Sequence, residues 1–225
     1  MLTETSAINE KEEASLEIVF ARLISYVFHP LFIPMYSLLL LYFGNQLNNF
    51  NIYASDTTKE ANYILFLYVF VFTILLPLVC SFVLRKIGLI SSFQLEKREE
   101  RQWPFTLTAC SYLLGFSLIQ NQIGSSINPL IIWILSGAQL GVFFALFISL
   151  FWKISIHMIG IGGFVGMCIL LVKVHLDWDN FLYLSILLSG LVGFARLRLR
   201  AHASSQVLVG FLLGLVTQIV FVFLI

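Results

Sequence analysis

The sequence predicts an all-α protein, a polytopic bundle of helices in a membrane. Of its 225 residues, 59% are hydrophobic and only 11% are charged, whereas ordinary soluble domains carry roughly 25% charged residues. A helix needs about 20 mostly apolar residues to span a bilayer, and stretches of this kind recur along the chain. They predict about seven spans (six to seven, because the third and sixth are short), at residues 19–44, 62–84, 104–121, 129–151, 154–174, 180–195 and 203–225.

The chain begins with a polar, acidic tail, residues 1–18, and continues as a single transmembrane domain, residues 19–225. A signal peptide has a basic start and a small-residue cleavage site, so we expect the first apolar stretch to remain as a span. We expect a kink or break at His29-Pro30 and Pro34, because proline lacks the amide donor that a helix needs. His29, like His175 on the opposite face, is expected to be structural.

The basic residues are distributed unequally between the two ends of the predicted spans. If all seven spans cross, ten Lys and Arg residues share the face of the N-terminal tail, and only Lys59 and Lys173 lie on the other face. By the positive-inside rule the richer face is cytoplasmic. The net charge of +1 gives no indication of nucleic-acid binding. The ten residues are Lys11, Arg85, Lys86, Lys97, Arg98, Arg101, Lys153, Arg196, Arg198 and Arg200.

Three polar segments on this face are candidates for one shared site. Two predicted spans separate each segment from the next, so all three return to the same side of the membrane. Cations and histidines at the mouth of a hydrophobic span are costly unless an anion meets them, which favours an anionic ligand at the membrane surface. The segments are Lys97-x3-Arg101-x2-Pro104, Lys153-Ile154-Ser155-Ile156-His157 and Ala195-Arg196-x5-His202-x3-Gln206.

These segments resemble the three signatures of the type 2 phosphatidic acid phosphatase (PAP2) superfamily. The third resembles Ser-Arg-x5-His-x3-Asp, the second Pro-Ser-Gly-His, and the first, in part, Lys-x6-Arg-Pro. The resemblance covers residues of about 95–214 and implies a divergent bacterial member with a PAP2-like core at about 62–225. It also implies an integral-membrane phosphatase that hydrolyses a lipid phosphate or polyprenyl diphosphate through a phosphohistidine, with no cofactor or metal.

The resemblance assigns a role to each matching residue. His202 is the nucleophile, and covalent relay divides one difficult displacement into two easier ones. His157 is the general acid. Phosphate oxygens are bound by Arg196, Arg101, Lys97 and Ser155, of which the arginines present a planar fork suited to phosphate.

Three departures from the signatures keep other functions open. Gln206 replaces the aspartate that orients the nucleophile; its carbonyl can accept the imidazole proton, but it cannot offset an imidazolium charge. Ile154 and Ile156 replace proline and glycine of the second signature. A catalytically degenerate lipid-binding or complex subunit is therefore one alternative, and a lipid phosphotransferase is the other. A transporter or channel is disfavoured, because the charges crowd one face. Both a homo-oligomer and a membrane complex are left open as assemblies.

Two sets of residues in the apolar stretches are expected to serve packing alone. The thiols have no paired spacing, so we expect neither disulfides nor a metal site from Cys80, Cys110 and Cys168. Small residues let membrane helices approach closely. A stripe of glycines should bring its helix against the one carrying His202: Gly160, Gly162, Gly163 and Gly166.

Overall fold

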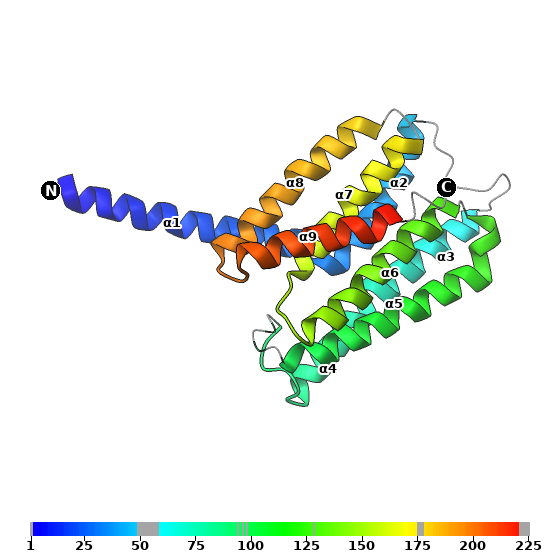
Figure 1. Ribbon diagram of the computed structural model, residues 1–225, viewed down its shortest axis with the longest axis horizontal. Coiled ribbons are helices and arrows are strands. Elements are labelled where there is room, and N and C mark those ends of the chain that lie inside the picture. The colour runs from blue at the N-terminus through cyan, green and yellow to red at the C-terminus, as the bar shows by residue number, and fades with distance from the viewer. Residues whose placement is uncertain are drawn as a thin grey trace.

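The computed structural model of the protein describes residues 2–48, 59–93, 95, 97, 99–127, 129–174 and 178–220, without the side chains of 2–14, 45–48, 59, 60 and 62. Every regular element in these ranges is helical, as the sequence predicts (Figure 1). The helices are α1 (Leu2–Val27), α2 (Ile33–Asn48), α3 (Lys59–Phe70), α4 (Leu76–Lys86), α5 (Gln102–Ile123), α6 (Pro129–Ser149), α7 (Ile156–Val174), α8 (Asp179–Arg198) and α9 (Ser204–Ile219).

Within the described residues, five helical stretches are long and apolar enough to cross a membrane. They are Ser15–Gly44, Tyr63–Lys86, Pro129–Ser149, Ile156–Val174 and Asp179–Arg198. Two of the seven predicted spans are not among them. Helix α5 has sufficient length but carries several amide side chains at its two ends, and the apolar helix Ser204–Ile219 is short, with residues 221–225 outside the described chain.

The predicted break in the first stretch is confirmed. Helix α1 ends at Val27, and a 3-10 turn at Pro30–Phe32 connects it to α2. Because Pro30 cannot donate a backbone hydrogen bond, the α-helical ladder stops there. The His29 side chain caps the turn by accepting from the Leu31 amide at 3.4 Å. The polar tail is helical as part of α1, which projects beyond the bundle (Figure 1).

Proline also shapes the joint between α3 and α4. A π-helical turn, Val71–Leu75, connects them, and Pro77 is the second residue after it. The Ser111 hydroxyl of α5 donates to the Phe72 carbonyl at 2.6 Å. Inside a membrane, carbonyls freed by an irregular turn need such partners, so this contact ties α5 to the α3–α4 pair.

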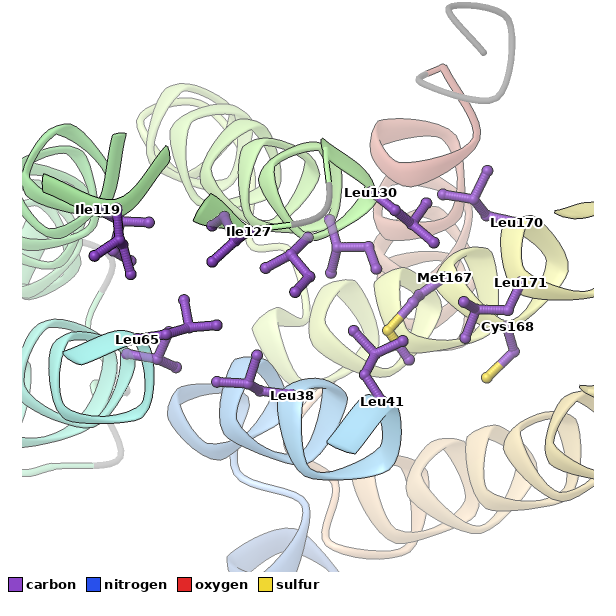
Figure 2. Packing of buried hydrophobic residues seen from close by; sticks show 14 of the residues in the cluster. Leu38, Leu41, Leu65, Ile119, Ile127, Leu130, Met167, Cys168, Leu170 and Leu171 are labelled. Carbon is purple, nitrogen blue, oxygen red and sulfur yellow. The ribbon is translucent and has the colours of Figure 1, made fainter. Parts of the chain in front are cut away.

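An apolar core joins the helices around α7. Figure 2 shows Leu38 and Leu41 of α2 and Leu65 of α3 facing buried side chains of α5, α6 and α7, including Ile119, Leu130, and Met167. Cys168 belongs to the same core and is a free, buried thiol, as expected, whereas Cys80 is half-buried and Cys110 is exposed. Close packing of such side chains holds membrane helices together, so the core fixes how the helices stand relative to one another.

The glycine stripe brings α7 and α9 into backbone contact, as predicted. A Cβ atom at Gly162 would overlap the carbonyl oxygen of Phe211, and one at Gly214 would overlap that of Ile159. At Gly210 a Cβ would lie 2.7 Å from the Ser155 carbonyl oxygen. The two helices therefore touch along their length, and the start of α9 lies against the start of α7.

The three polar segments lie at one end of the bundle. The connections α4–α5, α6–α7 and α8–α9 all emerge at the end where α1 meets the bundle, while α7 and α8 join at the other end (Figure 1). This arrangement follows from helices that alternate in direction. It agrees with the expectation that the three segments return to the same side.

Candidate functional site

His202 lies in the connection between α8 and α9, and Gln206 holds its imidazole. The Nδ1 atom of His202 lies 3.2 Å from Oε1 of Gln206, and the Ala203 amide donates to the same oxygen at 3.2 Å. Because an amide N–H only donates, the Gln206 atom must be the carbonyl oxygen, and His202 must donate from Nδ1. The neutral imidazole then carries an unprotonated Nε2, the form that a nucleophile requires.

His157 lies in the first turn of α7 and is only 8% exposed. Its Nε2 atom lies 3.1 Å from the backbone carbonyl oxygen of Ser25 in α1. A carbonyl only accepts, so Nε2 carries a proton. Among the described residues, Nδ1 of His157 has no hydrogen-bond partner although it is buried. Buried polar atoms are rarely left unpaired, so this nitrogen is free to bind a ligand.

Arg196 connects α8 to the same part of α1. Its Nη1 atom donates to the Ser25 hydroxyl at 3.3 Å, while its buried Nε has no partner among the described residues. The guanidinium interacts electrostatically with the imidazoles of His157 and His202. The second and third polar segments thus converge on one cation.

Ser155 lies directly before α7, at the end of the α6–α7 connection. The residue is fully buried, and its hydroxyl oxygen has no partner among the residues that the structure describes. Its backbone amide donates to the backbone carbonyl of Gln206 at 3.4 Å, which connects the second segment to the third. A free hydroxyl beside a helix N-terminus is suited to an anion.

The first segment is divided between the site and the surface. Arg101 is 5% exposed, donates from Nε to the Leu95 carbonyl at 2.8 Å and interacts electrostatically with His202. Burial lowers the pKa of its guanidinium from the ordinary value, and the Glu99 carboxylate opposes that shift. Lys97 lies apart: its side chain is 69% exposed and pairs with Glu100 at 3.6 Å. The structure therefore brings Arg101 towards the site and leaves Lys97 in an exposed ion pair.

His29 is the site residue that the sequence analysis missed. Its ring centroid lies 5.3 Å from that of His157, with the rings nearly perpendicular, and its imidazole interacts with the Arg196 charge. Ser25, which contacts both His157 and Arg196, was also missed. The adjacent Pro30 was the available signal, because a helix that ends at a proline places the preceding side chains at a bend. His175 lies outside the described residues.

Arg198 takes no part in this cluster. Its Nε atom donates to a carboxylate oxygen of Glu17 at 2.5 Å, on the surface between α8 and α1. Exposed pairs of this kind contribute about 0–1 kcal/mol. The contact therefore accounts for Arg198 without a ligand.

The environment of His202 lowers its pKa to about 4 from the ordinary 6.5. Burial is the largest cause, followed by the Arg196 charge, and Lys153 and Arg101 act in the same direction. The hydrogen bond to Gln206 opposes these effects. At pH 7 the imidazole is therefore neutral, with the Nε2 lone pair available.

The lowered pKa predicts an acid-sensitive fold. Below pH 6.5 the unfolded chain takes up a proton at His202, whereas the folded protein does not until about pH 4. The stability that His202 contributes is thus complete above about pH 6.5 and is lost as pH falls from there to about 4. Between pH 7 and pH 5, we expect a larger fall in melting temperature for the wild type than for His202→Asn. Equal falls in the detergent-solubilised proteins would contradict this.

A cavity of about 380 Å³ lies beside the cluster that His29, His157, Arg196 and His202 form. Residues of α2, α6 and α7 contribute to its wall. His29 lines it, whereas His157, Arg196 and His202 do not. A site shared by the polar segments would place the imidazoles of His157 and His202 on one cavity, and this cavity does not meet that expectation. The side chains of His157 and Arg196 contact Ser25 of α1 instead.

The fold and the cluster define an all-helical protein with five apolar helices suited to a membrane and a group of histidines and arginines at one end of the described bundle. No family model, no curated protein and no solved structure matches the chain.

Proposed function

We propose that the protein is an integral-membrane lipid phosphatase that transfers the phosphoryl group of a lipid phosphate or diphosphate to His202 and then to water. One observation carries the proposal: Gln206 holds His202 with Nε2 unprotonated, while Arg196 interacts with both His202 and His157. A neutral nucleophile, a cation and a second imidazole are the groups that phosphoryl transfer to histidine requires. The resemblance to PAP2 signatures supports the same roles.

In the first step, the Nε2 lone pair of His202 attacks phosphorus, and the bond from phosphorus to the lipid oxygen breaks. The leaving alkoxide takes a proton from Nδ1 of His157, because Nε2 of that ring is engaged with the Ser25 carbonyl. A bound phosphate dianion favours the protonated form of His157 that this transfer needs. Arg196 and Arg101 bind the phosphate oxygens, where charge gathers during transfer.

In the second step, water attacks the phosphohistidine. The phosphorus–nitrogen bond breaks, Nε2 of His202 recovers its lone pair, and the proton of the water passes to Nδ1 of His157. The sum is a lipid phosphate and water giving a lipid alcohol and inorganic phosphate. Ser155, whose buried hydroxyl has no partner in the described chain, is placed to donate to a phosphate oxygen.

The membrane face of the site follows from charge. The cationic end of the bundle holds most of the Lys and Arg residues, so the positive-inside rule puts it on the cytoplasmic side of a bacterial inner membrane. The lipid candidates are phosphatidic acid, phosphatidylglycerol phosphate, polyprenyl diphosphate and lipid A.

Two other functions use the same cluster. A phosphotransferase would pass the phosphoryl group from His202 to an alcohol, and a degenerate subunit would bind the lipid without turnover. Gln206 favours the second of these, because a glutamine offers no charge to an imidazolium.

Phosphate release by the purified wild-type protein tests the proposal. We expect release from at least one of the four lipids in detergent micelles without added metal, and no increase when a diacylglycerol or prenol acceptor is added. Transfer to the acceptor in place of release would indicate the phosphotransferase. Binding of the lipids without release or transfer would indicate the subunit and contradict the proposal.

A further inference from the structure

The cavity that His29 lines has the size of a ligand site. Its volume is about 380 Å³, and ligand pockets in proteins range from about 300 to 1,000 Å³. Helices α4, α5, α6 and α7 and the Pro30–Phe32 turn all contribute to its wall. It lies beside the histidine cluster and is separate from it, so the roles proposed above leave it unexplained.

The wall of the cavity offers few polar contacts; one is Oε1 of Gln218, which is buried and has no partner among the described residues. Four of its hydroxyl groups each donate to a carbonyl of their own helix, at 2.7–3.0 Å, and so have no proton left to offer: Ser37, Ser81, Thr108 and Thr217. Most other lining side chains are apolar, such as Leu135, Val142, and Phe164. The wall therefore suits a hydrocarbon.

The length of the cavity corresponds to one leaflet of a bilayer. Along α6 it extends from Ala145, near the cationic end, to Ile134. At 1.5 Å per residue this is roughly 16 Å, about half of the roughly 30 Å hydrocarbon core. The cavity is thus about as long as the hydrocarbon of one leaflet is thick.

Exposed side chains mark where the cavity opens. Tyr26, Leu78 and Phe93 line it and are 66%, 46% and 49% exposed, respectively. All three are large and apolar in most of their surface, and Leu78 lies within a stretch apolar enough to span the membrane. The opening therefore faces lipid, and an occupant can enter sideways from the bilayer.

His29 supplies a polar contact at the cationic end of the cavity. Because Nδ1 accepts from the Leu31 amide, the proton of the neutral ring is on Nε2. In the described chain, Nε2 of His29 makes no hydrogen bond. The ring lies between the cavity, which it lines, and His157, whose ring centroid is 5.3 Å away.

We propose that the cavity binds one hydrocarbon chain of a phosphate-bearing lipid, and that His29 contacts the oxygen linking that chain to its headgroup. That the ligand carries a phosphate rests on the proposed function, whereas the site for its hydrocarbon chain is inferred from the cavity itself. It narrows the ligand to an amphiphile with a chain about as long as one leaflet is thick. His29 acts as a positioning residue, which holds the linking oxygen between the cavity and the histidine cluster.

Photolabelling tests the chain site without turnover. The probe is hexadecyl phosphate with a diazirine near the chain end, used with the full-length protein in nanodiscs. We expect labelled peptides from the cavity wall between Ile134 and Ala145, and competition by unmodified hexadecyl phosphate. Labels confined to lipid-facing side chains such as Phe143 and Phe147 would overturn the proposal.

Two threonines on α5 give a matched pair of variants. Thr108 lines the cavity, whereas Thr106, two residues away, is exposed and does not. We expect Thr108→Phe to reduce labelling of the wall about fivefold or more by filling the space, and Thr106→Phe to leave it unchanged. Equal labelling in both folded variants would contradict the chain site. If Thr108→Phe does not fold, the wild-type labelling pattern still decides.

A substitution of His29 tests separately whether this residue contacts the oxygen that links the chain to the headgroup. Asparagine preserves an acceptor for the Leu31 amide but lacks the Nε2 proton. We expect His29→Asn to weaken binding of the alkyl phosphate about tenfold, and to leave labelling by the same photoreactive chain without phosphate unchanged. A uniform loss for both probes, or none, would refute the contact. If the cavity wall is labelled but no phosphate is released, only the proposed phosphatase activity is refuted. If phosphate is released but the wall is not labelled, only the site for the hydrocarbon chain is refuted.

Discussion

Replacement of His202 by alanine is expected to abolish phosphate release and to prevent any covalent phosphorylation of the protein. His202 is the only residue to which we assign the attacking atom. Loss of a nucleophile costs at least about 10³-fold in turnover. The measurement is release of inorganic phosphate from the best lipid substrate, with parallel detection of protein-bound phosphate.

Ser205→Ala is the matched control for this prediction. Ser205 lies three residues further along, in the first turn of α9, and is exposed. Its replacement should leave turnover within about twofold, since exposed substitutions rarely change stability by more than about 0.5 kcal/mol. If His202→Ala retained the activity of Ser205→Ala, another residue would have to be the nucleophile.

Replacement of Gly214 by alanine is expected to destabilise the protein more than any other single methyl group added to the bundle. The new Cβ would overlap the Ile159 carbonyl oxygen and lie 2.8 Å from the Gly163 amide nitrogen, so α9 would have to move away from α7. Overpacking of a filled interior costs typically 1–3 kcal/mol, and here the obstacle is rigid backbone. The check is the melting temperature of the detergent-solubilised protein.

Gly190→Ala provides the comparison within α8. A Cβ at Gly190 meets nothing within 4 Å, and alanine is favoured over glycine in a helix by about 0.8–1.0 kcal/mol. We expect Gly190→Ala to be as stable as the wild type or more so. Equal stability of the two variants would show that α7 and α9 are not in backbone contact.

The helices and their order were predictable because they depend on local properties of the chain. Apolar stretches of sufficient length predicted the helices, and prolines predicted the break before α2. The Gln206–His202 contact was predictable from the four-residue spacing of the third segment, because His202 lies just before α9 and Gln206 lies in its first turn. The spacing of the glycines predicted the approach of α9 to α7.

The remaining parts of the site depend on contacts between helices distant in sequence. Ser25 reaches His157 and Arg196 only because α1 packs against α8, and no local pattern in the sequence encodes that packing. For Lys97, a local contact replaces the predicted one. Its spacing suggested that it binds a phosphate, but its ammonium group pairs with the carboxylate of Glu100, three residues away. Local ion pairs of this kind compete with any predicted long-range contact.

The most direct test of the central claim is to locate the phosphoryl group on the protein during turnover. The wild type is mixed with a lipid phosphate, quenched in base, where phosphohistidine is stable, and digested for mass spectrometry. The account predicts acid-labile phosphate on His202 and on no other residue. Phosphate release with no trapped phosphohistidine, or with the group on His157 or His29, would contradict it.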